Sequence, residues 1–527
     1  MNYADLFRAT LPETVLELAA LLVLLVDLGL LRNAALKSRV ASATLIGVAG
    51  CAVAIWAVYA AGWGSLSNGS YVVLAAGGST AVAQVAILFL TALTLALFID
   101  TGFTRNPGEY VAVVLMAAAG GLIIAAAQDL LVIFVGLELL SLGLYILTAF
   151  AKKSAKSAEA SIKYYLFGGM SAAFLLFGFS YLYGLSGSTS LPRVVLGTYM
   201  ASAHGGTFLL LIALVMIAVG LGFKVAAVPF HLWAPDTYEG APAPAAAFIA
   251  SVSKVASFAL LISISHAILW WPSMLHLTGG RVTFTVSPPG TPPPHMTYGF
   301  VSGWPLILMV LSAASMIIGN LAALAQTSVR RLLAYSAVAH AGYILLGLAF
   351  FGWANVSAQA ILYYIITYGL TTIGAFGVVG VVERATGSDK LDSFLGLQKR
   401  NPLLAAVLLV LFLSLAGIPP LVGFWAKFNL FAAVLTLGSG PFPVPGSLSS
   451  LPHEAVGLVA LAIAMSAVSL YYYLQVLKRA YVMPAADETP IHAHPVTLAV
   501  LLLIALAVLL MGVFPAVLQG WIAGFGA

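Results

Sequence analysis

The sequence predicts an all-α integral membrane protein of about fourteen transmembrane helices, with two inverted five-helix repeats. Three observations lead to this fold class: the composition, the apolar segments and the distribution of basic residues. Of the 527 residues, 62% are hydrophobic and only 7% are charged. Because a soluble domain carries about 25% charged residues, this chain cannot cover a water-facing surface, and the lipid bilayer must be its solvent.

A spanning helix needs about 20 mostly apolar residues, and this rule gives fourteen spans. The first thirty residues lack a basic region and contain Asp5, Glu13 and Glu17, so the first span is predicted to be a retained helix rather than a cleaved signal peptide. The spans are 12–31, 43–62, 80–99, 108–127, 130–149, 159–184, 207–229, 242–270, 304–325, 332–350, 356–382, 403–436, 454–480 and 495–521.

The basic residues fix the orientation of these spans. If the N-terminus lies outside, sixteen of the 22 Lys and Arg residues fall in inside loops. The outside segments hold three, Arg8, Arg193 and Arg281, and three more lie within spans. Such an excess of positive charge inside predicts that both termini lie on the periplasmic side of the cell inner membrane.

Two spans are interrupted, and their positions predict the repeats. Pro229 follows Lys224 in the seventh span, and Pro419 and Pro420 precede Lys427 in the twelfth. Proline removes a helix hydrogen bond, and broken spans in corresponding positions are typical of inverted-repeat transporters. Because these spans are five apart, spans 4–8 and 9–13 are the predicted repeats.

This register divides the chain into four parts. They are an N-terminal three-helix segment (1–107), a first repeat (108–270), a second repeat (304–480) and a C-terminal helix (481–527). The outside stretch 271–303 contains the letters SPPGTPPP, which favour an extended chain. It is either a contact surface or a plain loop.

Four ionisable residues lie at membrane depth: Glu138, Lys224, Lys254 and Lys427. A charge at the bilayer centre costs about 2.5–3.5 kcal/mol on insertion scales. One interpretation is a structural ion pair between Glu138 and a lysine, which explains only two of the four residues. The other is a proton relay, since burial disfavours a charged ammonium and a nearby carboxylate favours it.

Histidines add candidates to this relay. His340 lies in the span that corresponds, in the second repeat, to the span of Glu138, so it is either a relay group or a satisfied core residue. His231 is a proton entry point or an interfacial residue, and His266 is a weaker candidate. Asp236 and Glu239 are expected to close or cap an inside loop.

Several kinds of site are not supported by the sequence. The single cysteine, Cys51, provides neither a disulfide framework nor a thiolate metal cluster. No pair of histidines has helical metal-ligand spacing, and no glycine-rich loop is suited to cradle a phosphate. The basic residues are scattered, which argues against nucleic-acid binding.

Five motifs carry a resemblance to a known family. They are GLELLSLGLYIL (136–147), GLGFKVAAVPFHLWAPDTYEGAPAP (220–244), SVSKVAS (251–257), LLAYSAVAHAGY (332–343) and LAGIPPLVGFWAKF (415–428). In order and spacing they resemble the antiporter-like membrane subunits of respiratory complex I, the proton-pumping NADH:quinone oxidoreductase, over about residues 10–520. The LPE at 11–13, the lysine in span 12 and the end of the chain after span 14 are most similar to the N-type subunits.

The resemblance implies a function and partners. It implies that Glu138, Lys224, Lys254 and Lys427 form the central axis of one proton channel, driven by redox chemistry in other subunits. It implies no cofactor in this chain, with NAD, FMN, iron–sulfur clusters and quinone in the other membrane and peripheral subunits of complex I. The alternatives are a subunit of a multi-subunit sodium/proton antiporter and a scaffold subunit that does not pump.

Overall fold

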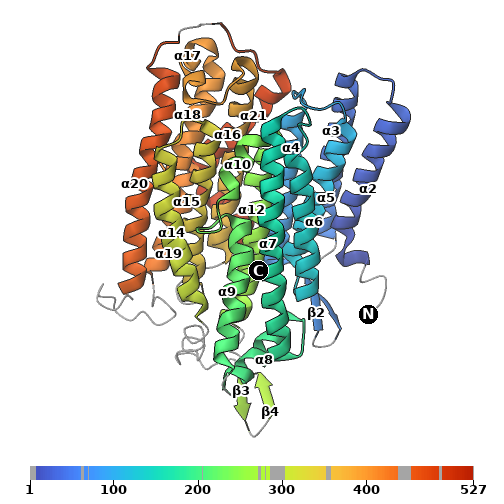
Figure 1. The fold of residues 1–527 in the computed structure, drawn as a ribbon, viewed down its shortest axis with the longest axis vertical. Coiled ribbons are helices and arrows are strands. Elements are labelled where there is room, and N and C mark those ends of the chain that lie inside the picture. Colours follow the sequence, from blue (N-terminus) through green and yellow to red (C-terminus); the bar gives the residue numbers. More distant parts are fainter. Residues whose placement is uncertain are drawn as a thin grey trace.

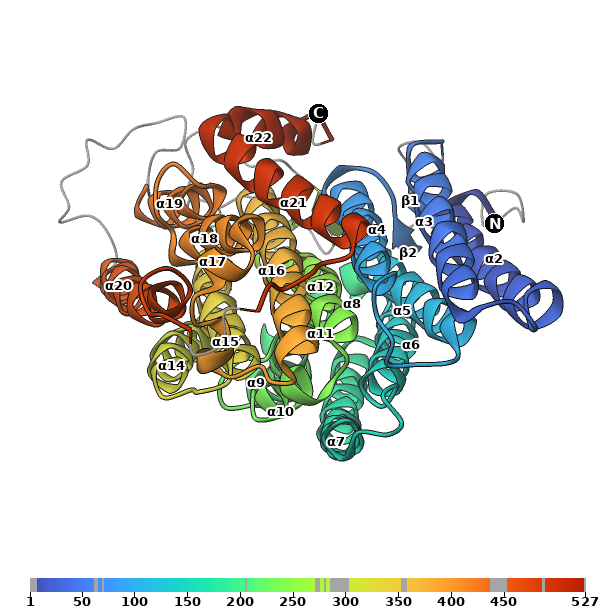
Figure 2. The same ribbon diagram turned by 90° about the horizontal axis from the view of Figure 1, so that it is seen from above.

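The chain folds into a bundle of mostly upright helices that follow one another across the molecule. The computed structural model describes residues 7–60, 65–68, 71–203, 206–270, 275–278, 281–284, 303–351, 358–436, 453–485 and 489–525. Small hairpins lie at one end of the bundle and α17 lies at the other (Figure 1). Seen from above, the N-terminal helices lie on one side and α20 on the opposite side (Figure 2).

The N-terminal segment consists of three helices and a hairpin. They are α2 (Leu11–Leu25), which continues as the π-helix η1 (Val26–Leu30), then α3 (Leu36–Ala60), the antiparallel pair β1 (Ser65–Asn68) and β2 (Tyr71–Ala75), and α4 (Gly78–Phe98). Arg39 donates to both carboxylate oxygens of Asp27 at 2.7 and 2.8 Å. Asp27 also accepts a hydrogen bond from the backbone N–H of Gly108, 3.1 Å away, which ties this segment to α5.

The predicted first repeat contains eight helices, two of them short. They are α5 (Pro107–Ala126), α6 (Leu130–Thr148), α7 (Ala155–Ser186), α8 (Leu191–Ala203), α9 (Thr207–Val225), α10 (Trp233–Gly240), α11 (Ala243–Ala250) and α12 (Val252–Trp270). Within 271–303 the structure has the hairpin of β3 (Leu275–Thr278) and β4 (Arg281–Phe284). The proline-rich letters of that stretch lie outside the described residues.

The remaining helices belong to the predicted second repeat and the C-terminal part. They are α14 (Trp304–Leu324), α15 (Val329–Ala349), α16 (Ala358–Thr386), the 3-10 helix η3 (Leu391–Phe394), α17 (Leu397–Arg400), α18 (Pro402–Ala416), α19 (Val422–Leu435), α20 (His453–Tyr481), α21 (Pro495–Val513) and α22 (Pro515–Gly524).

The prediction of a mostly helical membrane protein is confirmed. In the described part of the chain, 12 helices are long and apolar enough to cross a membrane. Four predicted spans differ from a single long helix. The span 12–31 runs as a 15-residue α-helix followed by η1, and the stretch 403–436 forms the two shorter apolar helices α18 and α19. The span 242–270 is interrupted at Ser251 between α11 and α12, and the span 495–521 at Phe514 between α21 and α22.

Two helices end abruptly within the bundle. After α9, Ala226 takes the left-handed conformation with φ 59°, and after α18, Gly417 does so with φ 88°. The freed backbone groups find partners inside the protein, because the N–H of Val228 donates to Ser315 Oγ at 2.9 Å and that of Gly423 to Ser414 Oγ at 3.2 Å. Irregular backbone is tolerated at membrane depth where it is sealed in this way.

Glycines allow α14 and α15 to pack at close range. A Cβ on Gly319 would lie 2.6 Å from the backbone nitrogen of Ala339, and one on Gly342 would lie 2.8 Å from that of Met316. Both obstacles are backbone atoms, which cannot move aside as a flexible side chain would. Small residues at such crossings are typical of helix association in membranes.

We predict that Gly319→Leu destabilises the protein by about 1–3 kcal/mol, because overpacking forces two backbones apart. The measurement is the thermal unfolding midpoint of the purified protein in detergent. Gly457→Leu is the matched control, since no atom lies within 4 Å of a Cβ built at Gly457 on α20. Equal midpoints for Gly319→Leu and the unsubstituted protein would contradict this account of the crossing.

Candidate functional site

Lys224 lies buried in the last turn of α9 and contacts α6. Its ammonium donates a hydrogen bond to Ser141 Oγ, and the Ser141 hydroxyl donates in turn to the carbonyl of Leu137. Glu138, three residues before Ser141, lies close enough to Lys224 for a Coulombic interaction. The two side chains therefore approach each other at one site, with Ser141 as the direct partner of the ammonium.

Glu138 is only half-buried. Its neighbours on the same face of α6 are large apolar side chains that are exposed in this chain, namely Leu131, Val135, Leu142 and Ile146. The spacing of these residues places the carboxylate at the edge of the bundle's outer surface, while Lys224 points inward.

Lys254 lies at the start of α12, just after the chain is interrupted at Ser251 between α11 and α12. The Lys254 side chain is 2% exposed, so its ammonium is shielded from solvent and lipid. The ammonium donates to the carbonyl oxygen of Ala337 on α15 at 2.6 Å. It also lies 5.8 Å from the ring centroid of Tyr368 on α16, within the range of a cation–π contact.

His340 lies between Lys254 and Lys427 and interacts electrostatically with both. Its Nδ1 is 2.9 Å from the hydroxyl of Tyr364, and its Nε2 is 3.5 Å from that of Tyr473. Each ring nitrogen of a histidine can donate or accept, depending on the tautomer. Both ring nitrogens of His340 therefore face a tyrosine hydroxyl.

Lys427 is buried beside the break between α18 and α19. Its ammonium donates to the carbonyls of Leu415 and Ala416 at 3.2 and 3.0 Å, and to Ser466 Oγ at 2.8 Å. These acceptors match the three protons of an ammonium. The carbonyls come from the last turn of α18, so the break supplies the oxygens that hold the charge. The Lys427 ammonium also lies 5.3 Å from the ring centroid of Tyr343.

The structure therefore joins three of the predicted residues into one cluster and brings the other two together at a second place. Lys254, His340 and Lys427 share a set of buried tyrosines, while Lys224 and Glu138 meet at α6 and α9. Within the described residues, none of the buried lysines Lys224, Lys254 and Lys427 forms a salt bridge with a carboxylate. Each ammonium is held by neutral oxygens, which solvate a proton without trapping it as a full counter-charge would.

Sequence reasoning missed the hydroxyls and the amide of this site. A tyrosine or serine is not costly to bury when it is hydrogen-bonded, so nothing in the hydropathy pattern marks it. Asn320, for example, donates to Tyr343 at 3.1 Å and accepts from Tyr472 at 3.1 Å. The missed residues include Ser141, Asn320, Tyr343, Tyr364, Tyr368, Ser466 and Tyr473.

The other predicted histidines lie apart from this cluster. His231 is buried between α9 and α10, with its ring 6.2 Å from that of Tyr335, and its Nδ1 has no partner in the part of the chain that is described. His266 is exposed on α12, and its ring lies 6.2 Å from that of Phe351.

Asp236 and Glu239 form an ion-pair cluster rather than a loop closure. Both lie on α10, which is a helix where a loop was expected. Asp236 accepts from Lys163 of α7 at 2.8 Å and from Arg331 of α15 at 2.6 Å. Arg331 also reaches Glu239 at 3.0 Å. The cluster joins the two predicted repeats at the end of the bundle where the inside loops lie.

The electrostatics of Asp236 follow from these partners. Partial burial raises the pKa of its carboxyl, but the hydrogen bonds from Lys163 and Arg331 outweigh that effect and place the pKa below its usual value. The pKa of Glu239 is lowered in the same way by Lys156 and Arg331. The cluster is therefore ionised at neutral pH.

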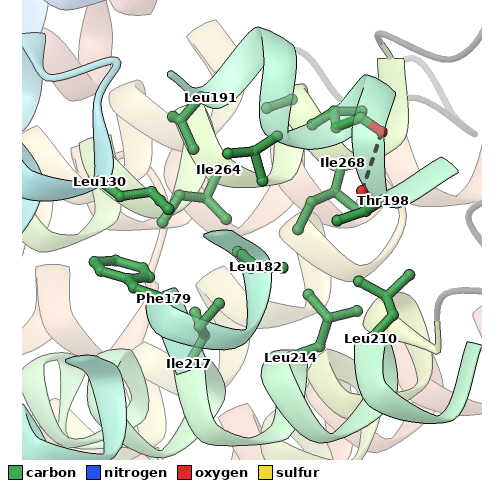
Figure 3. Close-up of a pocket in the computed structure, with 13 residues that line it drawn as sticks. Leu130, Phe179, Leu182, Leu191, Thr198, Leu210, Leu214, Ile217, Ile264 and Ile268 are labelled. Atoms are coloured by element: carbon green, nitrogen blue, oxygen red, sulfur yellow. Dashed lines mark hydrogen bonds between the residues drawn. The ribbon is translucent and has the colours of Figure 1, made fainter. Parts of the chain in front are cut away.

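A small apolar pocket lies apart from these charged residues. The pocket of Figure 3, between α7, α8, α9 and α12, is lined almost wholly by apolar side chains such as Phe179, Leu214 and Ile264. It holds only about 30 Å³, the share of one water in the liquid. Among the described residues, no group of three or more His, Cys, Asp or Glu is placed to hold a metal ion.

Comparison with known proteins identifies a family and several relatives. A family model described as NADH:quinone oxidoreductase/Mrp antiporter, TM, matches residues 127–284 and 294–451. NADH-quinone oxidoreductase subunit N 2 of Acidobacterium capsulatum is 45% identical, and the match covers 99% of each chain. NADH-quinone oxidoreductase subunit N of Nitrosomonas europaea is 33% identical over 98% of this chain and 96% of its own length.

Solved structures show the same architecture. A chain of respiratory complex I from Thermus thermophilus with bound Aureothin superposes with a TM-score of 0.72 at 30% identity, covering 97% of this chain and 98% of that one. A chain of the archaeal membrane-bound sulfane sulfur reductase has a TM-score of 0.77 at 22% identity, covering 100% of this chain and 97% of its own. At that identity the second likeness shows the fold alone.

We predict that Asp236→Asn lowers the thermal unfolding midpoint at neutral pH, because Lys163 and Arg331 lose their shared counter-charge. A carboxyl whose pKa is lower in the folded state than in the unfolded state stabilises the fold at pH values above the unfolded-state pKa, which is 3.8 for Asp. This contribution is lost as the pH falls through the folded-state pKa. The deficit should thus shrink below about pH 4. Glu159→Gln is the control, since in the described part of the chain the exposed Glu159 forms an ion pair only with Lys163. A deficit independent of pH would contradict this origin.

Proposed function

Because this chain belongs to the NADH:quinone oxidoreductase/Mrp antiporter family of membrane proteins, we propose that it acts as the N-type subunit of a bacterial NADH:quinone oxidoreductase, respiratory complex I. It is a multi-pass protein of the inner membrane and a proton-translocating part of the enzyme. The subunit is not itself the redox catalyst. NAD, FMN, iron–sulfur clusters and quinone are assigned to the partner subunits.

The observation that carries this proposal is the burial of three lysines against neutral oxygens. Lys224, Lys254 and Lys427 are each less than 9% exposed. A fixed structural charge at this depth would be expected to have a carboxylate partner, because an unpaired one is costly. Lysines solvated by hydroxyls and carbonyls, with His340 between two of them, are instead suited to take up and release protons.

The relay consists of Glu138, Lys224, Lys254, His340 and Lys427. Glu138 sets the proton affinity of Lys224 from the edge of the bundle, so a change at Glu138 alters the first lysine of the axis. His340 passes the proton between Lys254 and Lys427 through the tyrosine hydroxyls bound to its ring. Redox chemistry in the partner subunits drives these changes.

The finer architecture is part of the same proposal. The chain forms fourteen spans in which two inverted repeats, spans 4–8 and 9–13, each contain a broken helix. The four parts of the chain are 1–107, 108–270, 304–480 and 481–527. The ends of α9 and α18 support the two breaks, and the basic inside loops support placing both termini on the periplasmic side.

Two alternative functions are distinguished by the comparisons and by experiment. A sodium/proton antiporter subunit shares the fold, as the Mrp complex from Dietzia sp. shows with a TM-score of 0.76 at 20% identity over 98% of this chain and 51% of that one. The relatives that match with high identity over most of their length are instead named as NADH-quinone oxidoreductase subunits. A scaffold subunit would not need exchangeable lysines.

We predict that Lys224→Arg and Lys427→Arg assemble into the complex but lower proton pumping several-fold. Arginine keeps the positive charge but holds its proton, since its pKa is about 12 or higher. A purely structural charge would survive this change, whereas a relay group would not. Pumping is measured in inside-out membrane vesicles and normalised to the amount of assembled complex.

The control for these variants is Lys153→Arg, at an exposed lysine in the connection before α7. It should pump like the unsubstituted complex. Full pumping by both Lys224→Arg and Lys427→Arg would remove the relay and leave the scaffold function. Pumping that requires sodium ions would favour the antiporter.

A further inference from the structure

A large polar cavity opens at the end of the bundle where the predicted inside loops lie. Its volume is about 490 Å³, enough for several waters. The loop before α5, the start of α7, the junction of α10 and α11, and the end of α16 form its walls. The charged residues that line it are Lys156, Glu239, Arg330, Glu383, Arg384 and Asp389.

One ridge of α16 leads from this cavity to the buried relay. Residues spaced by four lie along a single ridge of a helix. In α16 this ridge begins at Gly380, which lines the cavity, and passes Phe376, Thr372 and Tyr368 before it reaches Tyr364. Tyr364 hydrogen-bonds His340, and Tyr368 lies against Lys254. At 1.5 Å per residue the ridge is about 24 Å long.

Tyr238 of α10 lies beside the apolar side chain of this ridge, Phe376. Its ring centroid is 5.7 Å from that of Phe376, and it interacts electrostatically with Tyr368. Tyr238 precedes Glu239 and Gly240, which both line the cavity. The Tyr238 side chain thus lies beside Phe376, the apolar ring that separates the cavity-lining Gly380 from Thr372 on the ridge.

Three hydroxyls beside or along this route are buried without a partner among the described residues. Within the described residues, the side-chain oxygens of Thr237, Tyr238 and Thr372 make no hydrogen bond. The hydroxyl of Thr372 is near that of Tyr368, one turn away, but the two do not reach hydrogen-bonding geometry. Because buried hydroxyls are normally satisfied by protein or by ordered water, each of these oxygens can take an ordered water as its partner.

We infer that Tyr238 and Thr372 form a proton-uptake path from the cavity to Tyr368, Lys254 and His340. This inference rests on the proposed function and adds residues to it. A hydroxyl accepts one hydrogen bond and donates another, so each can pass a proton to the next group and regain one from the previous water. No net charge remains on the hydroxyls, and Lys254 or His340 receives the proton.

Several other titratable side chains lie close to Tyr238 and to the cavity. Tyr164 of α7 and Tyr368 of α16 interact with Tyr238. His231, just before α10, is buried next to Tyr335 of α15. In the cavity, Lys156 is paired with Glu239 and Arg330 with Glu383. The charged groups are therefore paired at the mouth, and the deeper part of the path contains hydroxyls.

The experiment compares Thr372→Val and Tyr238→Phe in the assembled complex, in inside-out vesicles whose cytoplasmic face meets the buffer. Each change removes a hydroxyl and keeps nearly the same volume. Pumping relative to the unsubstituted complex should fall several-fold at high pH and recover as the pH is lowered. Proton uptake becomes limiting in the variants, and a higher proton concentration compensates for the slower path.

Two control variants separate the effect of losing a hydroxyl from the effect of disturbed side-chain packing. Thr372→Ser keeps the hydroxyl and should pump normally. Tyr363→Phe removes another buried, unpartnered tyrosine hydroxyl of α16 that lies off the ridge, and it should also pump normally. An equal loss in Thr372→Val and Thr372→Ser, or a loss that does not change with pH, would overturn the inference.

A further variant, Lys254→Ala, distinguishes failure of the proposed uptake path from failure of the proposed proton-pumping function. If Lys254→Ala abolishes pumping while Thr372→Val and Tyr238→Phe pump fully at every pH, the uptake path is wrong and the relay stands. If Lys254→Ala also pumps fully, the proposed function itself is contradicted.

Discussion

The rest of the structure depends on the need to solvate three ammonium groups inside a membrane protein without giving them counter-charges. A charge at membrane depth must find polar atoms, because lipid provides none. For Lys427 the chain supplies them by ending α18 early, because the last turn of that helix offers two carbonyls. Lys254 donates instead to the Ala337 carbonyl of α15, and Lys224 donates to Ser141 Oγ of α6. The break after α18 is therefore part of the chemistry and not only of the topology.

At the end of the bundle where the inside loops lie, ion pairs hold the helices together. Around α10, carboxylates and basic side chains pair across the two predicted repeats, and Arg330 adds a hydrogen bond to the carbonyl of Ala241. Near the cavity mouth water can screen and hydrate such pairs, so ionic contacts cost little there. Deeper in the bundle hydroxyls replace them. This gradient from ion pairs to neutral oxygens is consistent with a protein that admits protons but excludes other ions.

Much of this could be predicted from the sequence, for a physical reason. Charges within apolar runs are rare enough to be conspicuous, so Lys224, Lys254 and Lys427 were identified at once, and proline marked the breaks. Hydroxyls such as those of Ser141 and Tyr364 could not be found, since a buried tyrosine looks like any aromatic core residue. The half-exposed position of Glu138 was also hidden, because the identity of a residue does not reveal which face of a helix meets the bundle. The helical state of α10 was missed because eight residues rich in polar groups do not form a span.

The central claim is that these lysines change protonation during turnover. Infrared difference spectroscopy on the complete complex, with lysine labelled with ¹⁵N at the side-chain amine, tests it most directly. The account predicts that bands of the lysine ammonium, identified by their isotope shift, change when NADH is added, and that Lys254→Met removes part of that change. Lysine bands that stay the same between the resting and the turning-over enzyme, while pumping proceeds, would contradict it.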